Sequence, residues 1–177
     1  MATLLSYTFW GTTPDATLLQ AAGSTNFDIQ AQAERLLNDP RAVEAFDRFT
    51  EGWLFDRSYP FSVIESAQLQ ADLREETLRF VSENVFNNQP YDELITANYS
   101  YMNSNVANFY GERNVSGWER VEYTGDNATR SGVLGHASFL ATHTSTGRTS
   151  PIKRGVYLRH ALLCQEFPPP VAPVVEN

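Results

Sequence analysis

The residues from Ser66 to about Phe86 constrain the fold of this chain more than any other segment. Apolar side chains recur there at helical spacing along one stripe, formed by Leu69, Leu73, Phe80 and Val81. The remaining positions are mostly charged and are expected to face water: Asp72, Arg74, Glu75, Glu76, Arg79 and Glu83. The pattern predicts a long amphipathic helix, and such a helix must bury its apolar stripe against other elements.

Helices are also predicted on both sides of this run. The segments 13–23, 29–37 and 39–53 precede it, and each combines helical periodicity with a start or stop signal such as Thr13-Pro14 or Asp39-Pro40. The third segment carries bulky aromatic side chains at helical spacing, which predict a buried seam: Phe46, Phe49 and Trp53.

The pattern after Phe86 is less regular. Helices are predicted over 91–95, 103–110, 131–141 and 151–164. From Trp118 to Tyr123 the residues alternate loosely and a turn follows at 124–127, so at most one small β-hairpin is expected near 118–130. These features predict a mainly α protein, folded as a compact multi-helix bundle.

Composition narrows the classes of function. The net charge of −8 disfavours non-specific binding to nucleic acid or to an anionic membrane, both of which need a surplus of Lys and Arg. No stretch approaches the roughly 20 apolar residues of a membrane span. The single cysteine, Cys164, leaves no Cys/His spacing typical of a metal site or of covalent haem attachment, so no cofactor is expected in this chain.

The charges are unevenly distributed along this acidic chain. The segment from Arg130 to Cys164 has a charge of +5 and contains no Asp or Glu. A hydroxyl-rich loop and a predicted helix start at Ser150 lie within it, and exposed N–H groups at a helix start favour anions. The candidate anion-binding residues are Arg130, Arg148, Thr149, Ser150, Lys153 and Arg154. The alternative is that these cations pair with acidic helices such as 72–83.

All three histidines lie in the same basic segment. His136, His143 and His160 are candidates for acid or base chemistry near neutral pH, and the alternative is a role in the core or in capping. Their spacing does not support a metal site. Ser145 or Ser150 beside His143 is a conceivable nucleophile pair, but neither has a nucleophile-elbow motif or an assigned acidic partner.

Several longer stretches point to a family. They are residues 4–10, 14–19, 95–103, 107–111, 130–138 and 148–155. In these residues the chain resembles the paired domains of unknown function of planctomycete-type and myxobacterial cytochrome-c-associated exported proteins. The resemblance covers nearly the whole chain. It implies a bacterial, multidomain, periplasmic or extracellular parent protein, although the chain itself shows no signal peptide. It also implies haem c in a region downstream of this chain, and it assigns no catalytic residue.

The resemblance divides the chain into three parts. Residues 1–128 are expected to form a first helical domain, 129–166 the start of a second domain packed on the first, and 167–177 a proline-rich linker. The expected function is that of a non-haem helical module that docks or positions an adjacent module, such as a c-type cytochrome module, or an anionic ligand. Two alternatives stay open: a catalytic domain, oxidoreductase or hydrolase, with a His/basic pocket, and a structural spacer.

Overall fold

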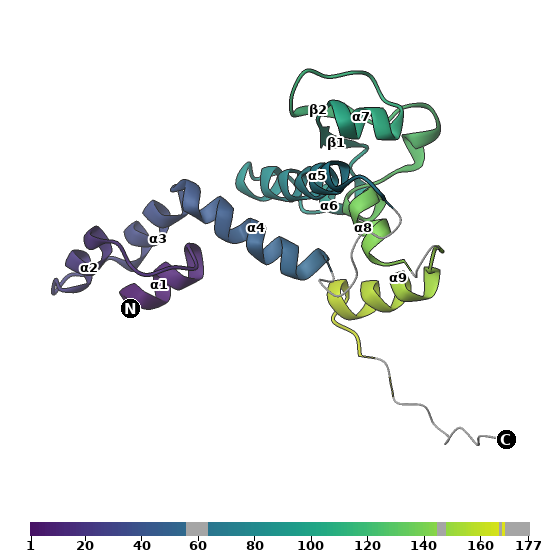
Figure 1. Cartoon of the computed structure of the whole chain (residues 1–177). Coiled ribbons are helices and arrows are strands. Elements are labelled where there is room, and N and C mark those ends of the chain that lie inside the picture. Colours follow the sequence, from purple (N-terminus) through teal and green to yellow (C-terminus); the bar gives the residue numbers. More distant parts are fainter. Residues whose placement is uncertain (56–63, 145–147, 167, 169–177) are drawn as a thin grey trace.

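The helix expected from the periodic run lies at the centre of the molecule. In this computed structural model, which describes residues 1–55, 64–144, 148–166 and 168, that helix is α5 (Ala67–Phe86). The Ser66 side chain accepts a hydrogen bond from the Leu69 N–H, which caps the first turn as expected. The elements that contact α5 most extensively are α4 (Pro40–Leu54), β1 (Tyr99–Met102), α7 (Ser104–Tyr110) and α8 (Ala137–Thr142) (Figure 1).

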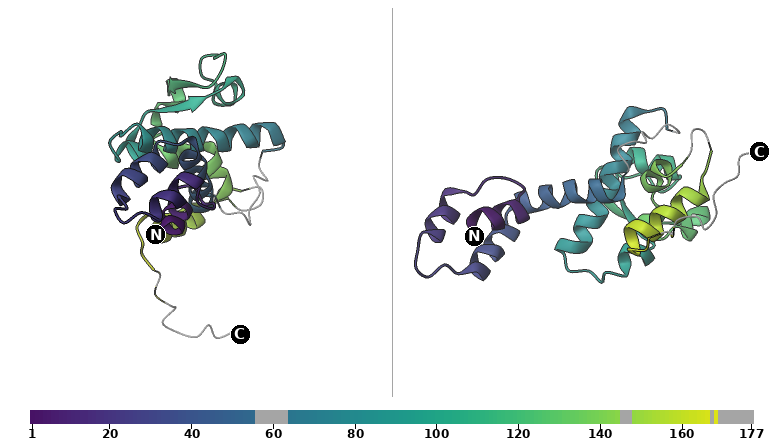
Figure 2. Two further views of the ribbon diagram at one scale, coloured as in Figure 1. Left: turned by 90° about the vertical axis from the view of Figure 1, so that its left-hand side faces the viewer. Right: turned by 90° about the horizontal axis from the view of Figure 1, so that it is seen from below.

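A smaller lobe at the N-terminus is built around Trp10. It contains α1 (Ala2–Phe9), α2 (Ala16–Ala22), α3 (Ile29–Leu37) and the start of α4. The buried Trp10 ring donates from Nε1 to the Leu36 carbonyl at 2.9 Å, and the Arg41 guanidinium lies 3.4 Å from the ring centroid. Helix α4 then leads from this lobe to the part of the molecule around α5 (Figures 1 and 2).

The structure differs from the sequence-based expectation at two places near the N-terminus. Helix α1 has no start signal in the sequence and was not expected. The helix expected over 13–23 begins later, because the side chain of Asp15, and not that of Thr13, accepts the capping hydrogen bond from Leu18. Asp15 also pairs with Arg35 of α3 at 2.9 Å, which ties the start of α2 to the next helix.

The aromatic seam expected along α4 is only partly buried, so that expectation is wrong. Phe49 is 60% exposed, whereas Phe46 and Trp53 are half-buried. Helix α4 extends beyond the N-terminal lobe, and α5 crosses it without covering the whole aromatic face. This leaves an open apolar surface between the lobe and α5.

The protein is mainly α, as expected, with a single two-stranded sheet in the part of the chain that the structure describes. Strand β2 (Glu119–Glu122) lies inside the range expected for a hairpin, 118–130. Its antiparallel partner is β1, with Tyr99 opposite Glu122, and not a strand after the turn. A 3₁₀ turn (Gly125–Thr129) occupies the position of the expected return strand.

The helix expected over 131–141 is broken in two. A 3₁₀ turn (Val133–Gly135) comes first, His136 then has an extended backbone (φ −68°, ψ 139°), and only then does α8 begin. The break lets Gly132 donate its N–H to the Ala97 carbonyl at 2.8 Å, next to the short helix α6 (Glu93–Thr96). This segment is therefore anchored to residues that lie far upstream.

The last helical segment follows the expectation closely. Helix α9 (Pro151–Tyr157) starts at an N-cap Ser150 with proline at the first helical position, and it continues as a π-helical turn (Leu158–Leu162). The expected polyproline tail, except Pro168, lies outside the described residues, as does Ser145. None of the described helices is both long and apolar enough to cross a membrane.

Gly132→Ala should destabilise the protein strongly. A Cβ at this position would lie 2.3 Å from the Leu94 carbonyl oxygen, and the backbone φ of +49° disfavours any L side chain. We expect the free energy of unfolding, measured in urea, to fall by about 2–4 kcal/mol. Gly117→Ala is the matched control, because nothing lies within 4 Å of its Cβ. Similar unfolding free energies for the two variants would contradict this packing.

Candidate functional site

A group of buried polar side chains lies where α5 meets β1, α7 and the start of α8. We call it the Glu76 cluster, and it consists of Glu76, Thr77, Ser100, Tyr110, Tyr123, His136 and Ser138. Glu76, Thr77, Ser100, His136 and Ser138 have 0% exposure. Buried polar groups are costly unless they are hydrogen-bonded, so the contacts of this cluster decide what it can do.

Tyrosine hydroxyls hold the Glu76 carboxyl group. Tyr110 donates to Oε2 at 3.0 Å, and Tyr123 donates to Oε1 at 3.4 Å. The Tyr110 oxygen in turn accepts the backbone N–H of Ala137 at 2.8 Å. A chain of hydrogen bonds therefore runs from α5 through α7 to the first residue of α8.

His136 is held from both sides of its ring. Its Nδ1 lies 2.8 Å from the Thr77 hydroxyl, and its Nε2 lies 3.2 Å from the Ser100 hydroxyl and 4.0 Å from Glu76 Oε1. The ring also meets the Phe80 ring at a centroid distance of 4.9 Å and an angle of 71°. All of these neighbours come from α5 and β1, so His136 fastens the segment before α8 to the centre of the molecule.

Burial shifts both titratable groups toward their neutral forms. It raises the pKa of Glu76 from 4.5 to about 7, although the hydroxyl groups around the carboxylate act in the opposite direction. Burial, followed by the nearby positive charge of Arg130, lowers the pKa of His136 from 6.5 to about 3. At neutral pH the histidine is therefore uncharged, and the pKa of the Glu76 carboxyl group lies close to the pH of the solution.

These shifts make stability depend on pH in opposite directions. The raised pKa of Glu76 adds stability below pH 4.5, and this contribution is lost as the pH rises through about 7. The lowered pKa of His136 adds stability above pH 6.5, and this contribution is lost as the pH falls toward about 3. The two effects offset each other between pH 4.5 and 6.5, where the fold should be most stable.

The cluster is closed to substrates. Its two tyrosines are 7% and 5% exposed, and the other five members have 0% exposure. The residues it contains resemble those of catalytic sites, but a reactant would have to open the core to reach them. We therefore assign it a role in joining the segments of the fold.

Sequence reasoning missed this cluster because Glu76 was expected to face water. That expectation is wrong for Glu76 and also for Asp72, which is 8% exposed. A signal was present: Glu76 follows Leu73 by three residues and precedes Phe80 by four, so it lies on the apolar stripe itself. Of the expected stripe, Leu73, Phe80 and Val81 are buried and Leu69 is half-buried against the core.

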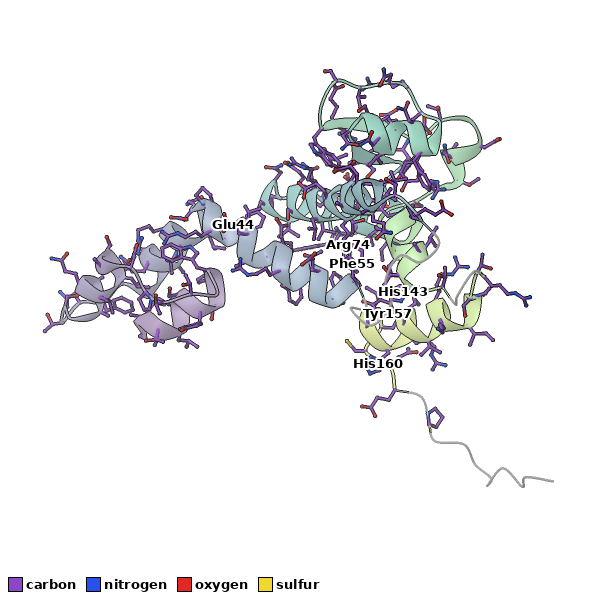
Figure 3. The ribbon with its side chains drawn as sticks, in the orientation of Figure 1. Glu44, Phe55, Arg74, His143, Tyr157 and His160 are labelled. Atoms are coloured by element: carbon purple, nitrogen blue, oxygen red, sulfur yellow. The ribbon has the colours of Figure 1, made fainter. Side chains whose placement is uncertain are left out.

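A second site, open to solvent, lies between α8 and α9. We call it the α9 pocket, with a volume of about 340 Å³, and its lining consists of Thr142, His143, Ile152, Lys153, Val156, Tyr157 and His160. Figure 3 shows His143 and Tyr157 next to each other where α8 and α9 meet, and His160 further along the same C-terminal helical segment. The described lining is basic and apolar and includes no carboxylate.

His143 forms the inner wall of the α9 pocket. Its Nε2 lies 3.1 Å from the Leu54 carbonyl oxygen, and because a carbonyl only accepts, this nitrogen carries the hydrogen. The ring packs against that of Tyr157 in a tilted arrangement, with a centroid distance of 3.9 Å and an angle of 31°. Trp53 of α4 anchors the π-helical turn, because its Nε1 donates to the Ala161 carbonyl at 3.1 Å.

The structure brings some of the expected site residues together and separates others. Lys153, His143 and His160 line the α9 pocket, whereas His136 belongs to the Glu76 cluster. Arg130 lies elsewhere, because its guanidinium donates to Asn127 and to the Gly135 carbonyl.

The remaining candidates for anion binding lie around the start of α9. Arg148 and Thr149 are exposed, and the Ser150 hydroxyl accepts the Lys153 N–H at 3.4 Å. The Nε of Arg154 is buried and has no hydrogen-bond partner within the described residues. An anion-binding role for this set therefore remains a prediction.

Comparison with known families gives two matches. Residues 1–111 match the family model PSD4, a protein of unknown function (DUF1592). The chain belongs to the PSD4 family. Residues 130–177 match a second model, PSCyt3, also a protein of unknown function (DUF1588), so the resemblance expected from the sequence is confirmed. Neither a curated protein nor a solved structure matches the chain.

The Glu76 cluster joins the two matched regions. Glu76, Thr77, Ser100 and Tyr110 lie within the PSD4 match, and His136 and Ser138 lie within the PSCyt3 match. The cytochrome-associated name of the second model raises the question of haem. Covalent attachment of haem c needs paired cysteines, and this chain has only Cys164, so its residues do not fit that role.

Glu76→Gln should change how stability depends on pH. Gln keeps the size of the side chain and stays neutral, so it removes the loss of stability that the ionising carboxyl group causes between pH 4.5 and about 7. The free energy of unfolding of the variant, measured in urea and compared with that of the wild type, should rise by about 3 kcal/mol as the pH goes from 4.5 to 8. Glu65→Gln, at an exposed position, is the control. Parallel profiles for wild type and Glu76→Gln would contradict the assignment.

Proposed function

We propose that this chain is a non-haem helical module of a larger exported protein, and that it docks an adjacent, negatively charged module or an anionic ligand at the α9 pocket. The observation that carries this proposal is the pocket itself: about 340 Å³, lined by Lys153 and two histidines, with no carboxylate among its described lining residues. It lies within the +5 segment of a chain whose net charge is −8.

The physical basis is the combination of charge and apolar surface. Ile152 and Val156 lie one helical turn apart on α9 and are 80% and 43% exposed. Lys153 and His160 lie beside them at the same pocket. An apolar patch next to positive charge suits a partner that presents both an apolar contact and an acidic group, because the charges steer the encounter and the apolar area stabilises the complex.

The domain division expected from the sequence fits this proposal. Residues 1–128 would act as the body, 129–166 as the start of the second domain, and 167–177 as a linker toward the rest of a periplasmic or extracellular parent protein. The Glu76 cluster supports this arrangement, because it ties residues 136–138 firmly to α5. The partner that we favour is an adjacent module of the same polypeptide, such as a c-type cytochrome module.

The catalytic alternative is less favoured. Only two of the three histidines share the pocket, and the Nε2 of His143 already contacts the Leu54 carbonyl. No carboxylate among the described residues lines the pocket to orient a histidine as a base. The spacer alternative differs from docking in one respect, since a spacer needs no particular charge on α9.

Lys153→Glu should weaken binding of the adjoining module of the parent polypeptide, produced separately and added to this chain. We expect about tenfold weaker affinity by isothermal titration, because reversing a contacting charge replaces attraction with repulsion. The difference should shrink as salt is raised from about 50 to 500 mM, because salt screens exposed charges.

The matched control is Arg113→Glu, the same change of charge at a side chain that is 59% exposed and lies outside the pocket. Binding by Arg113→Glu should stay within about twofold of the wild type. Equal affinities for wild type and Lys153→Glu, with both proteins folded, would favour the spacer and overturn the docking proposal.

A further inference from the structure

A groove of about 610 Å³ lies between the N-terminal lobe, α4 and the end of α5. Its two long walls are formed by Ala42, Ala45, Phe46 and Phe49 of α4 and by Val85 and Phe86 of α5. Residues of α1 and α3 close the side nearest the N-terminus. We call it the α4 groove, and it is separate from the α9 pocket and from the Glu76 cluster.

Aromatic rings in the walls of the α4 groove pack against one another. The rings of Phe46 and Phe86 meet edge to face, with centroids 5.6 Å apart and an angle of 85°. Phe49 lies 5.9 Å from Phe46, and its other neighbour is Trp53 at 6.0 Å. This packing orders the rings and still leaves Phe49 60% exposed and Leu37 45% exposed.

The small side chains in the α4 wall and the turn at the end of α5 explain why the groove stays open. Ala42 and Ala45 have small side chains, so α4 leaves space where larger residues would fill it. At the far end, Asn88 adopts a left-handed backbone (φ +53°), and the Gln89 N–H donates to the Asn84 carbonyl at 2.9 Å, which closes the last turn of α5. The end wall is therefore an ordered turn.

The chemistry of the lining selects the kind of occupant. No charged side chain is among the described residues that line the groove, although the chain as a whole is 19% charged. The polar groups are the hydroxyl of Thr8 and the amides of Asn38 and Asn88. The Nδ2 of Asn38 donates a hydrogen bond to the Glu34 carbonyl at 2.9 Å, which leaves the Oδ1 of Asn38 to accept one.

We propose that the α4 groove binds a neutral small molecule with a ring-bearing or branched apolar body and a hydrogen-bonding group at one end. A volume of about 610 Å³ lies within the range of small-molecule sites, roughly 300–1,000 Å³. An uncharged lining favours a neutral occupant, because an ion would lose its hydration there without gaining a partner of opposite charge. The aromatic walls match a ring-bearing body, and the amide of Asn38 matches a donor at its end.

A matched pair of fluorescent probes tests this inference. N-phenyl-1-naphthylamine is neutral, and 1-anilinonaphthalene-8-sulfonate has the same rings and one negative charge. Both are titrated into the full chain carrying Lys153→Glu, so that the α9 pocket does not contribute to binding of the sulfonate. We expect one saturable site for the neutral probe and about tenfold weaker binding of the sulfonate, because of its desolvation cost.

Two variants place the site, and one serves as a control. Phe49→Ala removes an exposed ring from the groove, and Ala45→Leu fills the groove while adding apolar surface. Each variant should bind the neutral probe about tenfold more weakly than the wild type. Tyr91→Ala removes a ring that is 76% exposed and lies outside the groove, and it should leave affinity within about twofold. Thermal unfolding checks that each variant is folded.

The contrary results are equally specific. Non-saturable binding, equal affinity for the two probes, or equal affinity in Phe49→Ala and Tyr91→Ala would each overturn the proposal. A dimer in analytical ultracentrifugation that Phe49→Ala dissociates would show that a second copy of the chain covers the groove, and this would also overturn it. None of these results depends on the α9 pocket.

Discussion

The Glu76 carboxyl group lies in the core, where tyrosine hydroxyl groups hold it, and this constraint ties two further segments of the chain to α5. A buried carboxyl group needs several hydrogen-bond donors, and no single neighbouring element supplies them. Tyr110 comes from α7, and Tyr123 follows β2. Glu76 thus ties α7 and the residue after β2 to α5.

His136 extends this constraint to the region matched by the second family model. Its ring is wedged among side chains of α5 and β1, and the Ala137 N–H next to it reaches the Tyr110 oxygen. The residues before α8 therefore have one way to lie against the body. Helix α8 in turn carries Phe139 and ends at His143, whose rings contact Tyr157 of α9.

Helix α4 links the other two surfaces. Its apolar face forms one wall of the α4 groove, and Trp53, near its end, donates to the Ala161 carbonyl in the π-helical turn that also carries His160 of the α9 pocket. The two surfaces differ in chemistry, since the lining of the groove is uncharged and that of the pocket is basic. If both proposals hold, the neutral molecule and the acidic partner would bind at different surfaces and would not compete.

The sequence predicted the parts of the fold that rest on local signals. Helices α3, α4, α5, α7 and α9 follow their periodicity and caps, and Gly111 ends α7 in the left-handed conformation expected of it. The misses involve contacts between distant residues. The partner of β2 is β1, the break at His136 depends on Thr77 and Ser100, and Phe49 stays exposed because of where α5 crosses α4. Local patterns carry no information about such pairings.

The central claim is that the Glu76 cluster fastens the segment around His136 to α5 as one cooperative unit. Hydrogen exchange of the Ala137 amide, measured by NMR on the full chain near pH 6, tests this claim most directly, because that amide donates to Tyr110 and not to a helical carbonyl. We predict that it exchanges only by global unfolding, with the same free energy as the amides of α5 around Phe80. Exchange at a much lower free energy than those α5 amides would show that the segment opens on its own, and would contradict the claim.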